Sequence, residues 1–262
     1  MSNLHWKTAI TQVRPNEIRL RGYRIDELMG RVTFGQAVYL ALRGDLPSPE
    51  VGRLIEAMLV SSIDHGATPP SALTARTVAS TGAPLNAAVA AGVLAISRYH
   101  GGAIEDAMRT LLDALARQDE EGTAAEAVAA QVIAEMRAAK RRVPGFGHRI
   151  HTDDPRTKRL FALAEEAGVA GRGVAMMRAL EAALAEALGR HLPINVDGAL
   201  AALLVDLGFS PEMGNAFFII ARLPGLVAHV YEEQARQRPM RRIHPTDHEY
   251  DGPPARDVTR DT

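Results

Sequence analysis

The sequence contains no cysteine among its 262 residues. Disulfides, thiolate nucleophiles and cysteine-ligated zinc or iron–sulfur sites are therefore excluded. Neither charge sign is in excess, because 30 basic residues face 31 acidic residues and the formal net charge is −1. A nucleic-acid-binding protein marked by a basic composition is not expected. Any catalysis by this chain must depend on His, Asp, Glu, Arg, Lys, Ser and Tyr.

Long apolar runs are lacking as well. No stretch approaches the roughly 18 consecutive apolar residues of a membrane span, and no apolar stretch follows a basic N-terminus. We therefore expect a cytoplasmic protein with neither a membrane nor a nucleic acid as partner. At roughly 150 residues per domain, the length corresponds to one large domain or two closely packed ones.

Most of the chain has the apolar spacing of amphipathic helices. Ser48 and Pro49 are typical of an N-cap and a first helical position, and Thr33 with Gln36 can form a capping box. Three apolar stripes at three- and four-residue steps are expected to form core. Their members are Val51, Leu54, Ile55, Met58 and Leu59; Ile104, Ala107, Met108, Leu111, Leu112 and Leu115; and Val174, Met177, Leu180, Leu184 and Leu188.

The C-terminal part predicts two successive helices. Ser210-Pro211-Glu212 opens the first, which should end before Pro224, and Pro224 should begin a second that continues to about Gln237. Only the alternation of Ile18 and Leu20 with charged residues suggests strands. The sequence therefore predicts an all-α, mainly helical fold with one short N-terminal β-hairpin.

Three shifts in composition divide the helical chain. They are Gly101-Gly102, the Gly-, Pro- and Arg-rich segment 140–156, and the connection 192–195. We expect a small helical domain over residues 101–197. Residues 1–100 and 198–262 would then form a discontinuous large domain.

The connections between helices hold the residues suited to chemistry: His65, His100, His148 and Asp197. Alone, each histidine or aspartate beside a glycine is typical of a structural or turn residue. Together they resemble a catalytic set, because a carboxylate can take a proton from carbon while imidazoles donate hydrogen bonds to a developing oxyanion. That set fits formation of an enolate from a carbonyl compound or a thioester.

Arginines in or beside the same connections indicate an anionic ligand. Arg156, Arg222 and Arg238 could pair with carboxylates in bidentate fashion. Cations 140–142 and Arg149 surround the glycines before His148, where a nucleotide phosphate could bind. The alternative for this cationic cluster is a solvated helix end favoured by the helix dipole.

The segment Pro144-Gly145-Phe146-Gly147-His148-Arg149, followed by Asp154-Pro155-Arg156, resembles the signature of the citrate synthase family. Further similar segments lie in the same order along about residues 6–245. They are Arg21-Gly22-Tyr23, Asp64-His65, His100-Gly101-Gly102-Ala103, Asn195-Val196-Asp197, and Ala221-Arg222 with Gly225, Ala228 and His229. The resemblance implies a two-domain helical fold, a homodimer with shared active sites, and a coenzyme A thioester as substrate, with no metal and no tightly bound cofactor.

The resemblance also implies roles for individual residues. Asp197 would exchange a proton on the methyl carbon of acetyl-CoA, His100 would hold the thioester oxygen, and His148 would act on the oxoacid oxygen. His65, Arg156 and Arg222 would bind substrate carboxylates, with Arg238 reaching across the dimer interface. Coenzyme A would lie against Arg142, Val143, Pro144, Gly145, Phe146, Gly147 and Arg149. The remaining histidines, His229 among them, are expected to be structural.

Three departures from a full citrate synthase resemble citryl-CoA lyase and the homologous C-terminal module of ATP-citrate lyase, which cleave citryl-CoA into acetyl-CoA and oxaloacetate. One of them is the end Arg242-Ile243-His244-Pro245. Only 16 residues separate Pro47 from Asp64, and a glycine follows His65. His100, in contrast, is the residue of the synthases. A minimal citrate or 2-methylcitrate synthase and a non-catalytic, CoA-binding regulatory homologue therefore remain as alternatives. A partner ligase could supply citryl-CoA.

Overall fold

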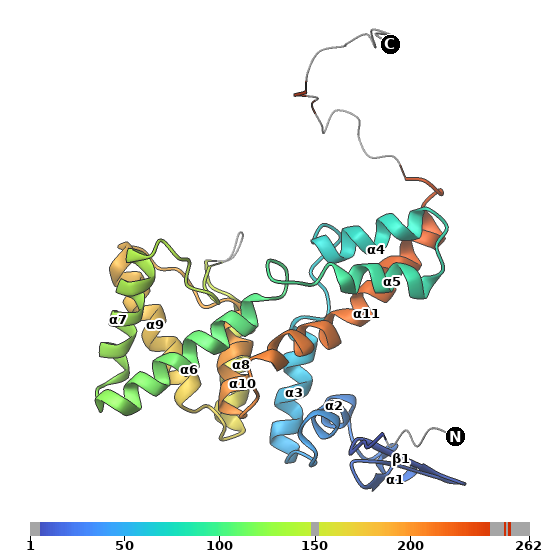
Figure 1. The fold of residues 1–262 in the computed structure, drawn as a ribbon, viewed down its shortest axis with the longest axis horizontal. Helices are drawn as coiled ribbons and strands as arrows, with labels where there is room; N and C mark the ends of the chain where they lie inside the picture. Colours follow the sequence, from blue (N-terminus) through green and yellow to red (C-terminus); the bar gives the residue numbers. More distant parts are fainter. Residues whose placement is uncertain (1–5, 148–151, 242–248, 250, 253–262) are drawn as a thin grey trace, which may run out of the picture.

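The computed structural model describes residues 6–147, 152–241, 249 and 251–252. Within this part the chain forms eleven helices and one small sheet, so the mainly α-helical fold is confirmed (Figure 1). The N-terminal elements are β1 (Thr11–Arg14), β2 (Glu17–Leu20), β3 (Tyr23–Arg24), α1 (Ile25–Leu28), α2 (Phe34–Arg43) and α3 (Pro49–Ser61). The others are α4 (Pro70–Ser80), α5 (Leu85–Leu94), α6 (Ala103–Glu121), α7 (Ala125–Ala138), α8 (Pro155–Glu166), α9 (Arg172–Leu188), α10 (Val196–Asp206) and α11 (Glu212–Arg236).

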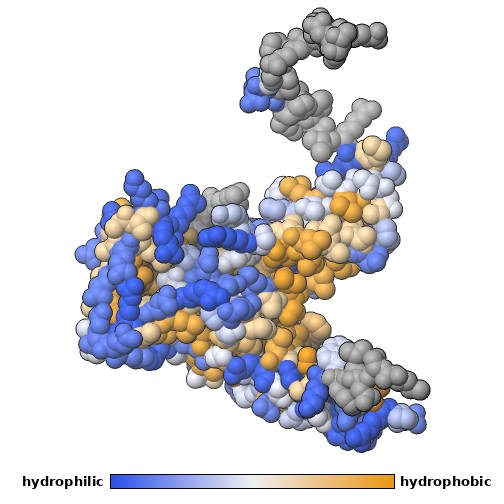
Figure 2. All heavy atoms as spheres, viewed as in Figure 1, coloured by the Kyte–Doolittle hydropathy of each residue, from blue (hydrophilic) through white to orange (hydrophobic). Residues whose placement is uncertain are grey.

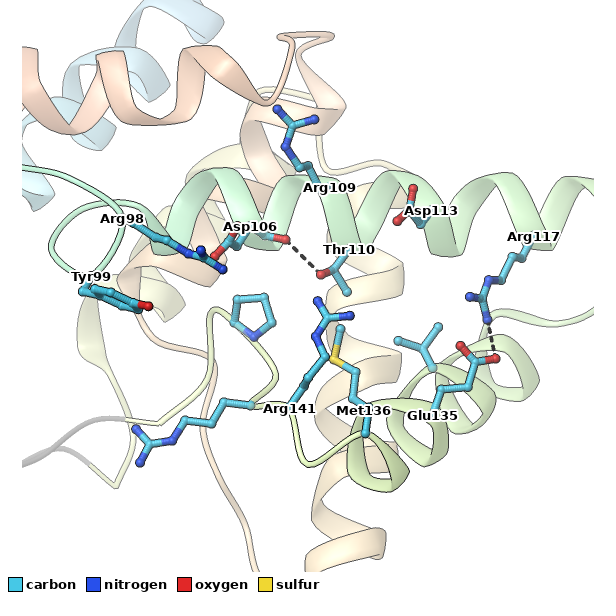
Figure 3. Close-up of a pocket in the computed structure, with 14 residues that line it drawn as sticks. Arg98, Tyr99, Asp106, Arg109, Thr110, Asp113, Arg117, Glu135, Met136 and Arg141 are labelled. Atoms are coloured by element: carbon cyan, nitrogen blue, oxygen red, sulfur yellow. Dashed lines mark hydrogen bonds and ion pairs between the residues drawn. The ribbon is translucent and has the colours of Figure 1, made fainter.

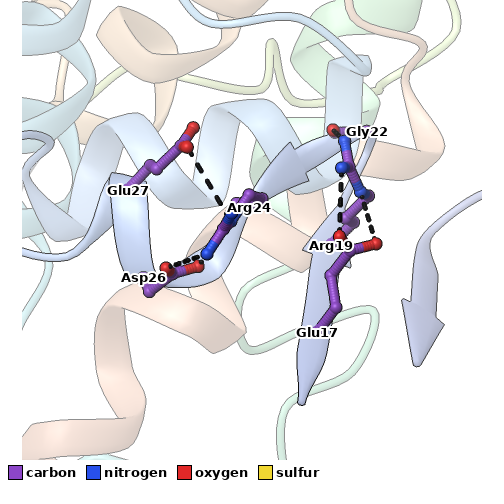
Figure 4. Close-up of polar contacts among 6 residues, drawn as sticks. All are labelled: Glu17, Arg19, Gly22, Arg24, Asp26 and Glu27. Carbon is purple, nitrogen blue, oxygen red and sulfur yellow. Dashed lines mark hydrogen bonds and ion pairs between the residues drawn. The ribbon is translucent and has the colours of Figure 1, made fainter. Parts of the chain in front are cut away.

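The N-terminal sheet has one strand more than the hairpin that the sequence predicts. β1, β2 and β3 pair antiparallel in that order, and Leu20 lies opposite Tyr23. The two residues between them, Arg21 and Gly22, both have positive φ, as a tight two-residue hairpin turn requires. Short ion pairs of Arg19 with Glu17 and of Arg24 with Asp26 lie along this sheet and α1 (Figure 4). Because these pairs are exposed, each contributes little stability.

The predicted starts of α2 and α3 are confirmed. The Thr33 hydroxyl accepts from the Gln36 amide at 3.3 Å, and the Gln36 side chain accepts from the Thr33 amide at 2.9 Å. Ser48 caps α3 by accepting from the Val51 amide at 3.2 Å. The predicted stripes are buried over most of their length. Leu112 and Leu188 are exceptions, at 38% and 39% exposed.

The prediction that a helix ends before Pro224 is wrong. α11 continues without interruption through Pro224 to Arg236. Proline removes one backbone hydrogen bond, but the buried face continues on both sides of it. Phe217 and Ala221 are buried before Pro224, and Leu226 and Val230 are buried after it. Burial of both halves outweighs the local cost of the proline.

The core has a large and a small cluster, which α11 connects. The large cluster joins α3, α6, α7, α8, α9 and α10 with the first half of α11, and the small one joins α4 and α5 with its second half (Figure 1). α11 is also long and apolar enough to cross a membrane. Its packing against α3, α4, α5 and α6 is that of a core helix.

Candidate active site

A cleft of about 630 Å³ opens where α4, α6, α8, α10 and α11 approach one another. Six residues that the sequence singled out line it, although they are far apart in the chain: His65, His100, Gly147, Arg156, Asp197 and Arg222. Ser62, Thr68, Pro69, Pro70, Arg98, Tyr99, Gly101, Ala103, Asn195, Val196 and Phe218 complete the lining. The fold therefore gathers a carboxylate, two imidazoles and three guanidinium groups around one space.

Asp197 lies in the first turn of α10, facing this cleft. The N-cap residue Asn195 accepts from the Gly198 amide at 3.1 Å, and its amide nitrogen donates to the Gly147 carbonyl at 2.9 Å. Burial raises the pKa of Asp197, while the charges of Arg156 and Arg222 act in the opposite direction. The result is a carboxyl group that binds a proton more tightly than an exposed aspartate does.

His100 occupies the turn before α6. The backbones of Ser97 and His100 exchange two hydrogen bonds of 2.9 Å, and Gly101 continues the turn with φ of +96°. The imidazole Nε2 lies 2.8 Å from the hydroxyl of Ser71, which is fully buried. Burial lowers the pKa of His100, and so does the charge of Arg222. The imidazole is therefore neutral near pH 7.

Arg156 is held by the residue that caps its own helix. The buried Asp154 accepts from the Arg156 amide at 3.0 Å and forms a bidentate pair with its guanidinium, at 3.0 and 2.8 Å. Planar bidentate pairing fixes the direction of an arginine side chain. Arg156 thereby reaches the cleft in a defined orientation.

Arg222 is buried in the middle of α11, at 4% exposure. Its Nε donates to the carbonyl of Ser62 at 3.0 Å, and its guanidinium carbon lies 4.7 Å from the centre of the Phe218 ring. Burial lowers the pKa of Arg222, although Asp64 and Asp197 nearby raise it. This buried cation is suited to binding a desolvated anion.

His65 lies in the segment after α3, whose residue Ser62 accepts a hydrogen bond from Arg222. Burial lowers the pKa of His65, and the charges of Arg222 and Arg156 lower it further. The neighbouring Asp64 lies 2.9 Å from His229 Nε2 on α11. His229 thus has a carboxylate partner beside the cleft.

The glycine-rich loop before residue 148 packs directly on the start of α10. A Cβ at Gly198 would lie 2.3 Å from the carbonyl oxygen of Gly145, and a Cβ at Gly145 would lie 2.7 Å from Gly198 Cα. The Gly147 amide donates to Pro193 O at 2.8 Å. Only residues without side chains permit this approach, which brings Gly147 to the edge of the cleft.

A second cavity, of about 730 Å³, adjoins the cleft (Figure 3). Arg98 and Tyr99 line both spaces, and α6, α7 and the segment 141–144 supply the rest of the wall. Arg98 and Arg117 lie at opposite ends of this cavity with Arg141 between them, and Arg117 pairs with Glu135 at 2.7 Å (Figure 3). Five arginines therefore line the cavity, of which Arg109 and Arg117 are paired with glutamates.

Some predicted residues are not brought together in this way. His148 and Arg149 lie outside the described residues. Arg238 is exposed in the segment after α11 and does not line the cleft of its own chain. Arg142 and Pro144 line the second cavity, and Val143 and Phe146 pack against the large core cluster.

The sequence interpretation missed the partners of the cleft residues. Ser71 beside His100, Asp154 beside Arg156 and the Asp64–His229 pair were not singled out as functional. A usable signal existed for the two aspartates, since each stands within two positions of a predicted ligand. Among the described residues, no three His, Asp or Glu side chains are grouped as a metal site requires.

The chain belongs to the citrate synthase family, because the family model for the citrate synthase C-terminal domain matches residues 41–245. Its structure is similar over its full length to that of citryl-CoA lyase from Hydrogenobacter thermophilus. That similarity has 44% identity and a TM-score of 0.88, and covers 97% of both chains. The fold is also that of the ATP citrate lyase from Methanosaeta concilii in complex with (3S)-citryl-CoA, at 24% identity and a TM-score of 0.79, covering 97% of this chain and 43% of that one.

Curated relatives match a large part of this chain. ATP-citrate synthase beta chain protein 1 of Oryza sativa subsp. japonica is 31% identical over 209 residues, which are 74% of this chain and 33% of that protein. Putative citrate synthase 2 of Mycobacterium tuberculosis is 33% identical over 195 residues, which are 72% of this chain and 49% of that protein. The matched region thus spans a third to a half of these relatives.

Proposed function

We propose that the protein is a citryl-CoA lyase that cleaves citryl-CoA into acetyl-CoA and oxaloacetate. The observation that carries this proposal is the single cleft that unites Asp197, His100, Arg156 and Arg222. The 44% identity to a citryl-CoA lyase over nearly the whole of both chains supports this reaction among those of the family.

The cations of the cleft are suited to the carboxylates of the citryl group. Arg222 is buried and Arg156 is fixed by Asp154, so neither must be ordered when an anion binds. Preordered guanidinium groups lose little conformational entropy on binding a carboxylate. His65 lies beside both arginines and completes the carboxylate site.

His100 is suited to the thioester oxygen. If the Ser71 hydroxyl donates to Nε2, the neutral imidazole carries its proton on Nδ1 and can donate from there. Cleavage of the carbon–carbon bond leaves its electron pair on the thioester fragment as an enolate. A donor directed at the enolate oxygen stabilises charge where it develops.

Asp197 then completes the reaction. A base takes the proton of the tertiary hydroxyl, the carbonyl of oxaloacetate forms as the carbon–carbon bond breaks, and protonated Asp197 gives its proton to the enolate carbon. We assign the base to His148, on the family resemblance. A raised pKa fits Asp197 both as proton donor in cleavage and as base in the reverse reaction.

The second cavity provides room for the remainder of coenzyme A. Because Arg98 and Tyr99 line both spaces, a chain that begins at the thioester can pass from the cleft into the cavity. We place the coenzyme A phosphates near Arg98, Arg141 and Arg142, next to the glycine loop 144–147. No tightly bound cofactor enters this proposal.

The active site is completed, in our proposal, by a second copy of the chain. Exposed apolar side chains gather on α5 and α11 and at the end of α3, and Figure 2 shows hydrophobic surface there. They are Leu94 at 83%, Tyr231 at 68%, Val60 at 59%, Ile63 at 44%, Leu223 at 41% and Val227 at 37%. A two-fold dimer across this surface would allow each exposed Arg238 to reach the partner's cleft.

The source of citryl-CoA is a further part of the proposal. The relatives named ATP-citrate synthase are about three times as long as the region that matches this chain. We propose that a partner ligase supplies citryl-CoA.

The products of synthetic citryl-CoA test the reaction. We expect acetyl-CoA and oxaloacetate to form faster than citrate and free coenzyme A. Rapid release of free coenzyme A and citrate would instead establish the citrate synthase reaction, which the 33% identity to a putative citrate synthase favours. If citryl-CoA binds but neither pair of products forms, the protein is a non-catalytic regulatory homologue.

A further inference from the structure

One face of α11 holds the segment that carries His65. Arg222, Gly225 and His229 are spaced three and four residues apart, so they lie along one side of the helix. In the same order, they contact three consecutive residues after α3: Ser62, Ile63 and Asp64.

Each of the three contacts is close. Arg222 Nε donates to the Ser62 carbonyl at 3.0 Å, and His229 Nε2 lies 2.9 Å from Asp64 Oδ1. Between them, a Cβ at Gly225 would lie 2.3 Å from the Ile63 carbonyl oxygen. The absence of a side chain at position 225 lets the segment lie directly on the helix.

The Asp64 carboxylate is held at both oxygens. Oδ2 accepts from the Gly66 amide at 2.9 Å, which closes a turn around His65, and Oδ1 lies against His229. Burial raises the pKa of Asp64, but hydrogen bonds from the Gly66 and His65 backbone and from His229 bring it below the ordinary value. A charged Asp64 thus connects the helix to the turn that carries His65.

We propose that Asp64 and His229 form a positioning pair that directs the His65 imidazole into the cleft, beside Arg156 and Arg222. His229, which the sequence suggested was merely structural, then acts on substrate binding through Asp64. This inference rests on the proposed function, because it treats His65 as a ligand for an oxoacid carboxylate. A ligand on a loop needs such support, since a displacement of about 1 Å already weakens a binding site.

The first experiment measures the affinity for oxaloacetate by calorimetry. In His229→Ala, Asp64 loses its partner on α11, and we expect oxaloacetate to bind about tenfold more weakly, as loss of a hydrogen bond to a charged group implies. The affinity for coenzyme A should not change. His229→Gln, which keeps an N–H donor at a similar reach, should retain most of the affinity for oxaloacetate.

A double-mutant cycle separates positioning from a general loss of structure. If His229 acts through His65, His229→Ala should have little further effect on oxaloacetate affinity once His65→Ala is present. A full tenfold loss in that background would overturn the proposal. Gln234→Ala is the matched control, because it removes one hydrogen bond, of 2.9 Å to Ala83 O, from the same helix. It should leave oxaloacetate affinity unchanged.

The NMR signal of the His65 imidazole distinguishes failure of this inference from failure of the proposed function. If oxaloacetate does not bind the wild-type protein, the substrate assignment fails. The positioning role of Asp64 and His229 is then tested by this signal alone. We expect a shift or broadening in His229→Ala and a signal close to wild type in His229→Gln. An unchanged signal in His229→Ala would refute the positioning pair.

Discussion

At the scale of single residues, the cleft is governed by what surrounds each charge. Asp197 and Asp154 lie in the same region but have different surroundings. Asp154 pairs with the Arg156 guanidinium at 2.8 Å, whereas burial raises the pKa of Asp197. The paired aspartate fixes the Arg156 side chain. The aspartate with the raised pKa is the one to which we assign proton exchange.

Replacement of Asp197 by asparagine tests this division. We expect Asp197→Asn to lower turnover of citryl-CoA at least about a hundredfold, while coenzyme A and oxaloacetate still bind. Because the native state raises this pKa, ionised Asp197 destabilises the fold, and stability is lost as the pH rises through the raised value. The variant should therefore melt at a higher temperature than the wild type at pH 8. Near-normal turnover would remove Asp197 from the mechanism.

The pH dependence gives a second test at this scale. Proton exchange into acetyl-CoA needs ionised Asp197, so its rate should fall as the pH drops through the raised pKa. The charge of Arg156 lowers that pKa, and Arg156→Gln should therefore move the acid limb to higher pH. The profile is measured by deuterium incorporation with oxaloacetate present. As a control, Arg117→Gln, at the far end of the second cavity, should leave the acid limb in place. A shift of the acid limb to lower pH in Arg156→Gln would contradict the assignment of Asp197 as the base.

At the scale of elements, the cleft depends on how closely backbones approach. The loop 144–147 is joined to the segment before α10 by hydrogen bonds from the Gly147 amide to Pro193 O at 2.8 Å and from the Asn195 amide to Gly145 O at 3.0 Å. Gly145 and Gly198 bring the two backbones together. These contacts place the predicted coenzyme A loop beside Asp197.

Gly198→Ala should disturb this contact. Helix propensity alone predicts that alanine stabilises α10 by about 1 kcal/mol. A Cβ at position 198, however, would lie 2.3 Å from Gly145 O, and such overpacking costs about 1 to 3 kcal/mol. We expect a lower free energy of unfolding in urea and weaker coenzyme A binding. An increase in stability would show that the loop can move away without cost.

At the scale of the whole molecule, the segment after α11 is attached to its own chain, while Arg238 remains exposed. The Met240 amide donates to Ser80 O at 2.6 Å, and Arg241 lies 2.8 Å from the buried Glu233, which also pairs with Arg76. An anchored segment with an exposed Arg238 is consistent with our proposal that this residue is supplied to a second copy.

Mixed dimers test the shared site. Arg238→Ala and Asp197→Ala homodimers should each be nearly inactive. Co-refolded heterodimers should recover activity, because one of their two clefts then holds both wild-type residues. Light scattering would check that dimers form after refolding. Mixed dimers without activity would exclude a role for Arg238 in trans.

The sequence by itself determined the helical class of the fold, the caps of α2 and α3 and the family, because these depend on neighbours a few residues apart and on an uninterrupted motif. Ser48, Thr33 and the signature from Pro144 to Arg156 act in this local way. It also indicated which residues would meet, although their roles remain predictions.

The tertiary structure decided what depends on contacts across long separations. The continuation of α11 through Pro224 follows from burial of both halves, which outweighs a local preference. The partners Ser71 of His100 and His229 of Asp64 lie 29 and 165 residues away from them in sequence. No local pattern encodes such pairs, because they form only when distant helices pack together. The same packing buries the groups between the helices and thereby changes their proton affinity.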